Sequence, residues 1–119
     1  MNDHNYKLNS FLYNKIKDIN NIKILEFGVR KGISTKLFVD LAEKNNGEVI
    51  SVDINDYSNL LNSDKWKFIH SRDDNFNKIK KEITFKLDVI FLDSFHEAEH
   101  VSNIIYNYYI LFIINIYDL

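Results

Sequence analysis

The sequence contains no cysteine and no proline, and only three of its 119 residues are glycine. Without cysteine, the chain forms no disulfide bond and offers no thiolate ligand to a metal ion. Because glycine is scarce, the positions of the glycines are informative. Two of them, Gly28 and Gly32, stand four residues apart directly after a short apolar run. The segment that contains these two glycines is therefore the first candidate functional site in the sequence.

An excess of charge of either sign is also missing, since 15 basic and 17 acidic residues give a formal net charge of −2. No strong field therefore favours nucleic acid or an anionic membrane as a partner. The polar segment 1–9 lacks the apolar core of a signal peptide, which favours a cytoplasmic protein. The apolar run 104–116 is interrupted by Asn107 and Asn115 and is shorter than the roughly 20 residues of a membrane span. We therefore expect no membrane partner.

The rest of the composition is that of an ordinary globular protein, with 45% hydrophobic and 27% charged residues. The length predicts a single domain over 1–119. Within it we expect an N-terminal helix in 1–20, a ligand-binding core in 21–101, and the end of a helix followed by an edge strand in 102–119.

Helical and extended patterns alternate along the chain, which predicts parallel βαβ units. Right-handed crossovers then place helices on both faces of a Rossmann-like open parallel sheet of about five strands. Helices are expected at 6–19, 34–45, 75–83 and 97–109. Strands are expected at 22–27, 48–54, 66–70, 87–92 and 111–117.

The loop after the first strand carries most of the functional argument. Open parallel sheets bind ligands beyond the carboxyl ends of their strands, and a ligand there needs backbone without a Cβ nearby. Gly28 and Gly32 supply this just before a helix whose free N–H groups favour anionic or polar ligand groups. Ser34 or Thr35 is expected to cap that helix. Glu26, at the end of the strand, would accept a hydrogen bond from a cationic group of the ligand, directly or through water.

An acidic residue at the end of the second strand suits the ribose of a nucleotide, because it accepts from both hydroxyls. Asp53 stands at that position, at the spacing from Gly28 typical of nucleotide-binding units. Structural alternatives remain open at this point: the two glycines as turn residues, Asp53 as a turn or cap residue, and Glu26 as a solvated strand end.

The pattern Glu26-x-Gly28-x-x-x-Gly32-x-Ser34, followed by Asp53, resembles motifs I and II of class I S-adenosylmethionine (SAM) dependent methyltransferases. The resemblance implies that these five residues bind SAM, with the carboxylate of the cofactor at the helix N-terminus. It covers residues 20–101 of the chain.

A dinucleotide dehydrogenase would instead prefer Gly-x-Gly-x-x-Gly, and Arg30 stands where its second glycine belongs. The same methyltransferase resemblance implies that an acid after the third strand contacts the adenine amino group. Asp73 is our choice and Asp74 the fallback, while a turn with a helix cap remains the structural alternative.

The segment after the fourth strand suits methyl transfer to oxygen, which needs a base or a cation at the hydroxyl. His96 fits the role of base because imidazole titrates near neutral pH. Asp93 fits as an oxygen ligand of a cation such as Mg²⁺, or as the group that orients His96. The alternative for His96 is a surface or cap histidine.

The same segment resembles the Asp-Gly-x-His-x-Tyr-Glu stretch of small O-methyltransferase-like domains akin to macrocin O-methyltransferase and cephalosporin hydroxylase-type proteins. Asp93, His96 and Glu99 match, while Ser94 and Ala98 depart from it. The resemblance implies a small-molecule or sugar hydroxyl as methyl acceptor, and implies Asp118 as a second metal ligand.

A competing motif overlaps this segment. His96-Glu97-x-x-His100 fits the zinc-hydrolase pattern, in which two histidines bind zinc and the glutamate acts as base. An acid at Glu99 is unusual in that pattern, and only 19 residues follow His100 to supply a third ligand. Zinc hydrolysis therefore stands as an alternative hypothesis.

Compared with the seven-stranded methyltransferase fold, the last strands are missing. The expected fifth strand at 111–117 would form an apolar edge, which is a template for pairing with another chain. We therefore expect a homo-oligomer through this edge strand. A non-catalytic SAM-binding or interaction module is the further alternative.

Overall fold

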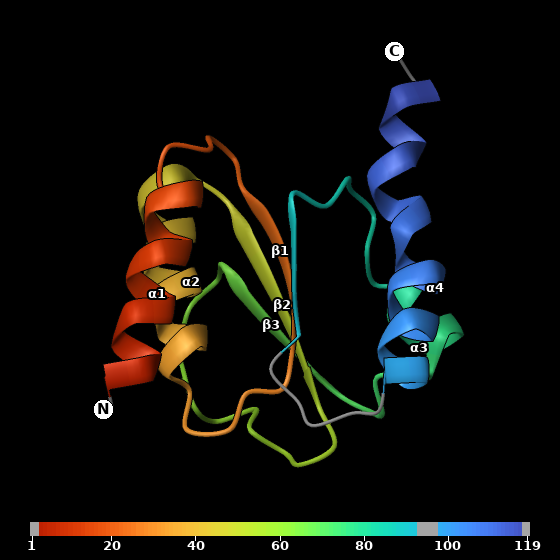
Figure 1. Cartoon of the computed structure of the whole chain (residues 1–119), viewed down its shortest axis with the longest axis horizontal. Helices are drawn as coiled ribbons and strands as arrows, with labels where there is room; N and C mark the ends of the chain where they lie inside the picture. The colour runs from red at the N-terminus through yellow and green to blue at the C-terminus, as the bar shows by residue number, and fades with distance from the viewer. Residues whose placement is uncertain (1–2, 93–97, 118–119) are drawn as a thin grey trace.

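The structure, a computed structural model, describes residues 3–92 and 98–117 and contains an open four-stranded parallel sheet (Figure 1). The strand order is β3-β2-β1-β4. The strands are β1 (Lys23–Phe27), β2 (Glu48–Asp53), β3 (Trp66–His70) and β4 (Val89–Leu92). The helices are α1 (Asp3–Ile16), α2 (Ile33–Asn45), α3 (Phe76–Lys80) and α4 (Ala98–Tyr117).

The helices lie on both faces of the sheet, as predicted. In Figure 1, α1 and α2 stand on one side of the strands, and α3 and α4 stand on the other. The expected Rossmann-like α/β arrangement is therefore confirmed, with four strands in place of about five.

The sheet divides the hydrophobic core into two layers. Alternation along β1 directs Ile24 toward α1 and α2, and directs Leu25 and Phe27 toward α3 and α4. By the same alternation, Glu26 and its cross-strand partner Ser51 belong to the α2 side of the sheet. Two polar residues thus occupy positions at which a buried parallel sheet normally carries apolar ones.

The predicted fifth strand at 111–117 is wrong, because α4 continues to Tyr117. No proline or glycine interrupts this segment, and a short apolar run fits a helix as well as a strand. Ile104 and Tyr108, one helical turn apart, are buried against the sheet. The edge strand expected within 102–119 is therefore not formed, and β4 is the edge on that side.

The predicted cap of α2 is also wrong. Gly32 occupies the N-cap position, with φ of 81°, and Ser34 and Thr35 lie inside the first turn. Their hydroxyls do not cap the helix because they donate to the carboxylate of Glu26. Within the parts of the chain that the structure describes, no helix has both the length and the hydropathy needed to cross a bilayer.

Candidate functional site

The candidate site lies at the carboxyl edge of the sheet. From β1 the chain builds outward to β2 and β3, and it then returns to place β4 on the other side of β1. The carboxyl ends of β1 and β4 therefore form the point at which the strand order reverses, where open α/β sheets bind ligands. The loop with Gly28 and Gly32 begins at this point.

Left-handed backbone shapes this loop. Gly28, Arg30 and Gly32 have φ values of 94°, 53° and 81°. The N–H of Gly32 donates to the carbonyl oxygen of Val29 at 2.9 Å, which closes a tight turn before α2. A Cβ on Gly32 would approach Cδ2 of Leu60 to 2.6 Å. Glycine at 32 therefore meets a conformational requirement, and the contact with the movable end of Leu60 adds a smaller steric one.

Asp53, at the tip of β2, is hydrogen-bonded to this loop. Its Oδ2 accepts from the N–H of Val29 at 2.8 Å, and its Oδ1 accepts from the N–H of Asn55 at 2.9 Å. The bond from the N–H of Asn55, two residues ahead, is typical of a turn residue, which was the structural alternative for Asp53. The bond to Val29 joins the loop at the tip of β1 to the tip of β2.

Glu26 is fully buried, so its interpretation as a solvated strand end is wrong. Its carboxylate accepts hydrogen bonds from Ser34 Oγ and Thr35 Oγ1, each at 2.6 Å, and from Ser51 Oγ at 2.8 Å. Ser51 Oγ also accepts from the indole Nε1 of Trp66 at 2.9 Å. The polar network thus extends from β3 through β2 and β1 to α2.

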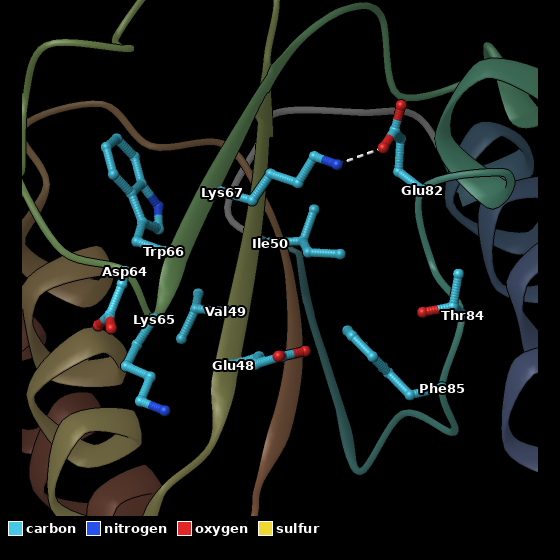
Figure 2. Close-up of a pocket in the computed structure, with 10 residues that line it drawn as sticks. All are labelled: Glu48, Val49, Ile50, Asp64, Lys65, Trp66, Lys67, Glu82, Thr84 and Phe85. Carbon is cyan, nitrogen blue, oxygen red and sulfur yellow. Dashed lines mark hydrogen bonds and ion pairs between the residues drawn. The ribbon is translucent and has the colours of Figure 1, made fainter.

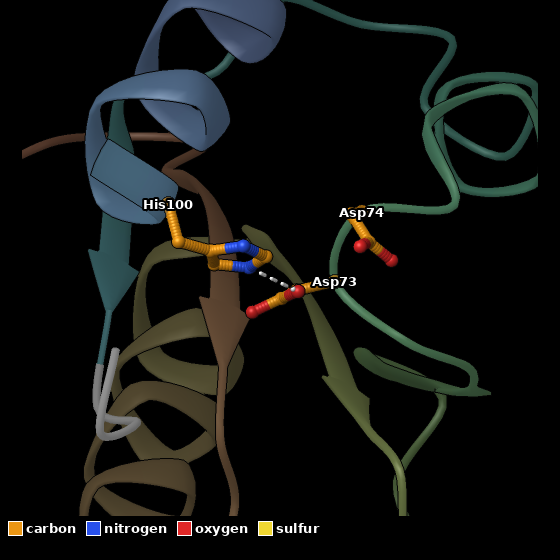
Figure 3. A group of neighbouring side chains, drawn as sticks. All are labelled: Asp73, Asp74 and His100. Atoms are coloured by element: carbon orange, nitrogen blue, oxygen red, sulfur yellow. Dashed lines mark hydrogen bonds and ion pairs between the residues drawn. The ribbon is translucent and has the colours of Figure 1, made fainter. Parts of the chain in front are cut away.

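Asp73 lies beyond β3 and contacts α4. Its Oδ1 is 2.9 Å from Nε2 of His100, and Tyr108 donates its hydroxyl to the backbone oxygen of Asp73 at 3.0 Å. Burial, together with the negative charges of Asp73 and Asp74, raises the pKa of the Tyr108 phenol. Figure 3 shows the His100 ring directed at Asp73 from the first turn of α4.

Asp74 is paired separately. Arg72 donates two hydrogen bonds to its carboxylate, each of 3.0 Å, and the guanidinium holds the pKa of Asp74 below its usual range. Potential ligand atoms of Asp73, Asp74 and His100 lie within 4.8 Å of one another. The contacts with Arg72 and His100 account for this grouping without a metal ion.

Four predicted residues, Asp93, His96, Glu97 and Asp118, lie outside the described residues. The predicted base, the predicted metal ligands and two members of the zinc motif therefore stay predictions. His100, the remaining member of that motif, lies in α4 with its Nε2 at Asp73.

A separate cavity of about 250 Å³ lies at the amino ends of β2 and β3, the edge opposite the candidate site (Figure 2). Its walls carry groups of both charges and two aromatic rings, and an ion pair between Lys67 and Glu82 lies along one side. Of the described residues predicted to bind the cofactor, none belongs to its lining.

The contacts of Thr35 and Ser51 with Glu26 were not predicted from the sequence. A signal was present, because Ser51 interrupts an otherwise apolar buried strand, and buried polar groups are nearly always hydrogen-bonded. In a parallel sheet with Glu26 on the neighbouring strand, a contact between the two is the simplest solution.

Comparison with known proteins adds no family to this description, since no family model matches the chain and no curated protein is significantly similar to it. The fold and the contacts at the carboxyl edge of the sheet are thus the basis of the functional argument.

Proposed function

We propose that this chain binds SAM at the carboxyl edge of β1 and β2 and transfers its methyl group to the hydroxyl of a small molecule. The observation that carries the proposal is the 2.8 Å hydrogen bond from the Val29 N–H to Oδ2 of Asp53. It joins a glycine-containing loop to a strand-end acid, the two parts that a nucleotide cofactor needs next to each other.

The chemistry of the residues fits an adenosyl ligand. Each oxygen of an ionised carboxylate has about two acceptor sites, so one backbone bond to each oxygen of Asp53 leaves capacity for ribose hydroxyls. Gly28 and Gly32 have a left-handed backbone and no Cβ, so at these two positions before α2 no side chain separates the main chain from a ligand. The first N–H groups of that helix suit the carboxylate of the cofactor.

The order of the strands supports the expected adenine contact. β3 pairs with β2, and Asp53 lies opposite His70 in the register, so the segment after β3 begins at the same edge. Asp73 follows three residues after His70 and is only partly buried. We assign it to the adenine amino group, with His100 and Tyr108 fixing its position.

Bound SAM would supply a methyl group already activated on a sulfonium, so the protein mainly orients the two reactants and takes up the hydroxyl proton. The loop, Asp53 and Asp73 would orient the cofactor. His96 stays our choice of base, and Asp93 our choice of cation ligand or orienting group.

Calorimetry with SAM and its demethylated product, S-adenosylhomocysteine, tests the proposal. We expect both to bind, and we expect Asp53→Ala to weaken binding by about 1–3 kcal/mol, the cost of a lost charged hydrogen bond. Asp56→Ala is the matched control, because Asp56 also accepts from a backbone N–H two residues ahead but lies in the exposed part of the following loop. A folded protein that binds neither compound at millimolar concentration would contradict the proposal.

A further inference from the structure

We infer that Glu26 is a positioning residue that holds the loop between β1 and α2 from inside the fold and does not itself contact the ligand. This inference rests on the proposed cofactor site, and it replaces the expected contact between Glu26 and the ligand's ammonium group with an indirect role.

Burial supports this role of Glu26. Glu26 has an exposed fraction of 0%, and so does Thr35, which donates to it. A contact with the ammonium group of a ligand would require a carboxylate oxygen to be reachable from the loop side. Instead, hydroxyl donors approach its oxygens from inside the fold, Ser34 and Thr35 from α2 and Ser51 from β2.

The donors to Glu26 also stand at informative positions in the chain. Glu26 is the second-last residue of β1, and Ser34 and Thr35 are the second and third residues of α2. Their hydrogen bonds therefore bridge the two ends of the loop that contains Gly28 and Gly32. Ser51 adds the neighbouring strand, whose tip carries Asp53. One carboxylate thus joins all three elements that frame the proposed site.

The loop needs such a support. Three of its five residues, 28 to 32, are left-handed, and glycine adopts this conformation readily at 28 and 32. Arg30 carries a Cβ, so its left-handed conformation persists only where the surrounding structure determines it. Both carboxyl oxygens of Glu26 accept from hydroxyls of the framing elements, Oε2 from Ser34 and Oε1 from Thr35 and Ser51. Without one of these bonds, we expect the loop to sample other conformations and the competent one to become less populated.

The experiment compares two ligands and two variants. S-adenosylhomocysteine carries the ammonium group, whereas 5′-methylthioadenosine shares the adenosine part but lacks the amino acid. We expect each variant, Glu26→Gln or Thr35→Val, to lower the affinity for the two ligands by the same factor. For Thr35→Val this factor is about fivefold, the order expected for the loss of one net hydrogen bond. Thr84→Val, an isosteric change at an exposed threonine, is the control and should leave both affinities unchanged.

The outcome that overturns the inference is selective loss. If Glu26→Gln weakens S-adenosylhomocysteine alone and Thr35→Val weakens neither ligand, Glu26 contacts the ammonium group directly. Affinities are measured at a temperature at which circular dichroism shows each variant folded.

Amide hydrogen exchange provides a second readout that needs no ligand. The inference predicts faster exchange at residues 28–35 in Thr35→Val than in the unmodified chain, with no change at β3. Equal exchange in the loop would overturn it. If the unmodified chain binds neither nucleoside but its loop responds to Thr35→Val, the proposed function fails while the positioning role holds.

Discussion

At the scale of single residues, the site depends on polar side chains placed where the core would otherwise be apolar. Glu26 and Ser51 face each other across β1 and β2, and Thr35 meets them from α2. Burying such polar groups costs free energy unless every hydrogen-bond partner is present, because the loss of one partner leaves the others unsatisfied. The network therefore fixes one arrangement of the loop.

Gly32→Ala is expected to lower the free energy of unfolding by about 1–2 kcal/mol, the cost of a left-handed residue with a Cβ. The contact with Leu60 adds less, because the end of that side chain can move. Gly32→Asn should be less harmful, since asparagine tolerates this conformation, as Asn21 and Asn46 do here. Urea denaturation of both variants measures the difference, and equal stabilities would contradict the backbone argument.

Single residues were predicted from the sequence with mixed success. Glycines and acids at strand ends were recognised because their spacing follows from the βαβ unit. The burial of Glu26 was missed, since a local pattern does not reveal which hydroxyls lie across the sheet. The contact between His100 and Asp73 joins residues 27 positions apart and left no local signal.

At the scale of elements, α4 is the part whose prediction was least accurate. The four observed strands were all expected from apolar runs, with bounds within two residues. The segment after 109 is apolar without a period that separates helix from strand, so only packing decides its structure. α4 is positioned by Ile104 and Tyr108 in the core, and by the hydrogen bond from Tyr108 to Asp73.

The raised pKa of Tyr108 gives this docking a pH dependence. The unfolded chain loses the phenolic proton near pH 10 while the folded chain retains it, so the stabilising contribution of Tyr108 decreases as pH rises above about 10. Tyr108→Phe should lower stability by about 1 kcal/mol near neutral pH through the lost hydrogen bond. The deficit should shrink at alkaline pH.

Denaturation of this variant and the unmodified chain between pH 7 and 11 measures that change. Tyr106→Phe, at a tyrosine of α4 with 82% of its surface exposed, is the control and should follow the unmodified chain. A constant deficit for Tyr108→Phe across the range would argue against the docking of this hydroxyl.

At the scale of the whole molecule, ligand binding and stability are linked. A ligand that binds only the folded chain stabilises it by about 2.7 kcal/mol at a concentration one hundred times its dissociation constant. We expect S-adenosylhomocysteine to raise the thermal midpoint by several degrees, and Asp53→Ala to reduce this rise at the same concentration. Differential scanning fluorimetry measures both, and an identical rise in Asp53→Ala would remove Asp53 from the site.

The position of Trp66 has a practical consequence. It is the single tryptophan of the chain, and its indole donates to the same serine that holds Glu26. Tryptophan fluorescence therefore reports on one site, the β3 end of the hydrogen-bond network that runs from α2 through Glu26 and Ser51. Rearrangements around the loop can be followed in real time by this native optical probe, without attaching a dye.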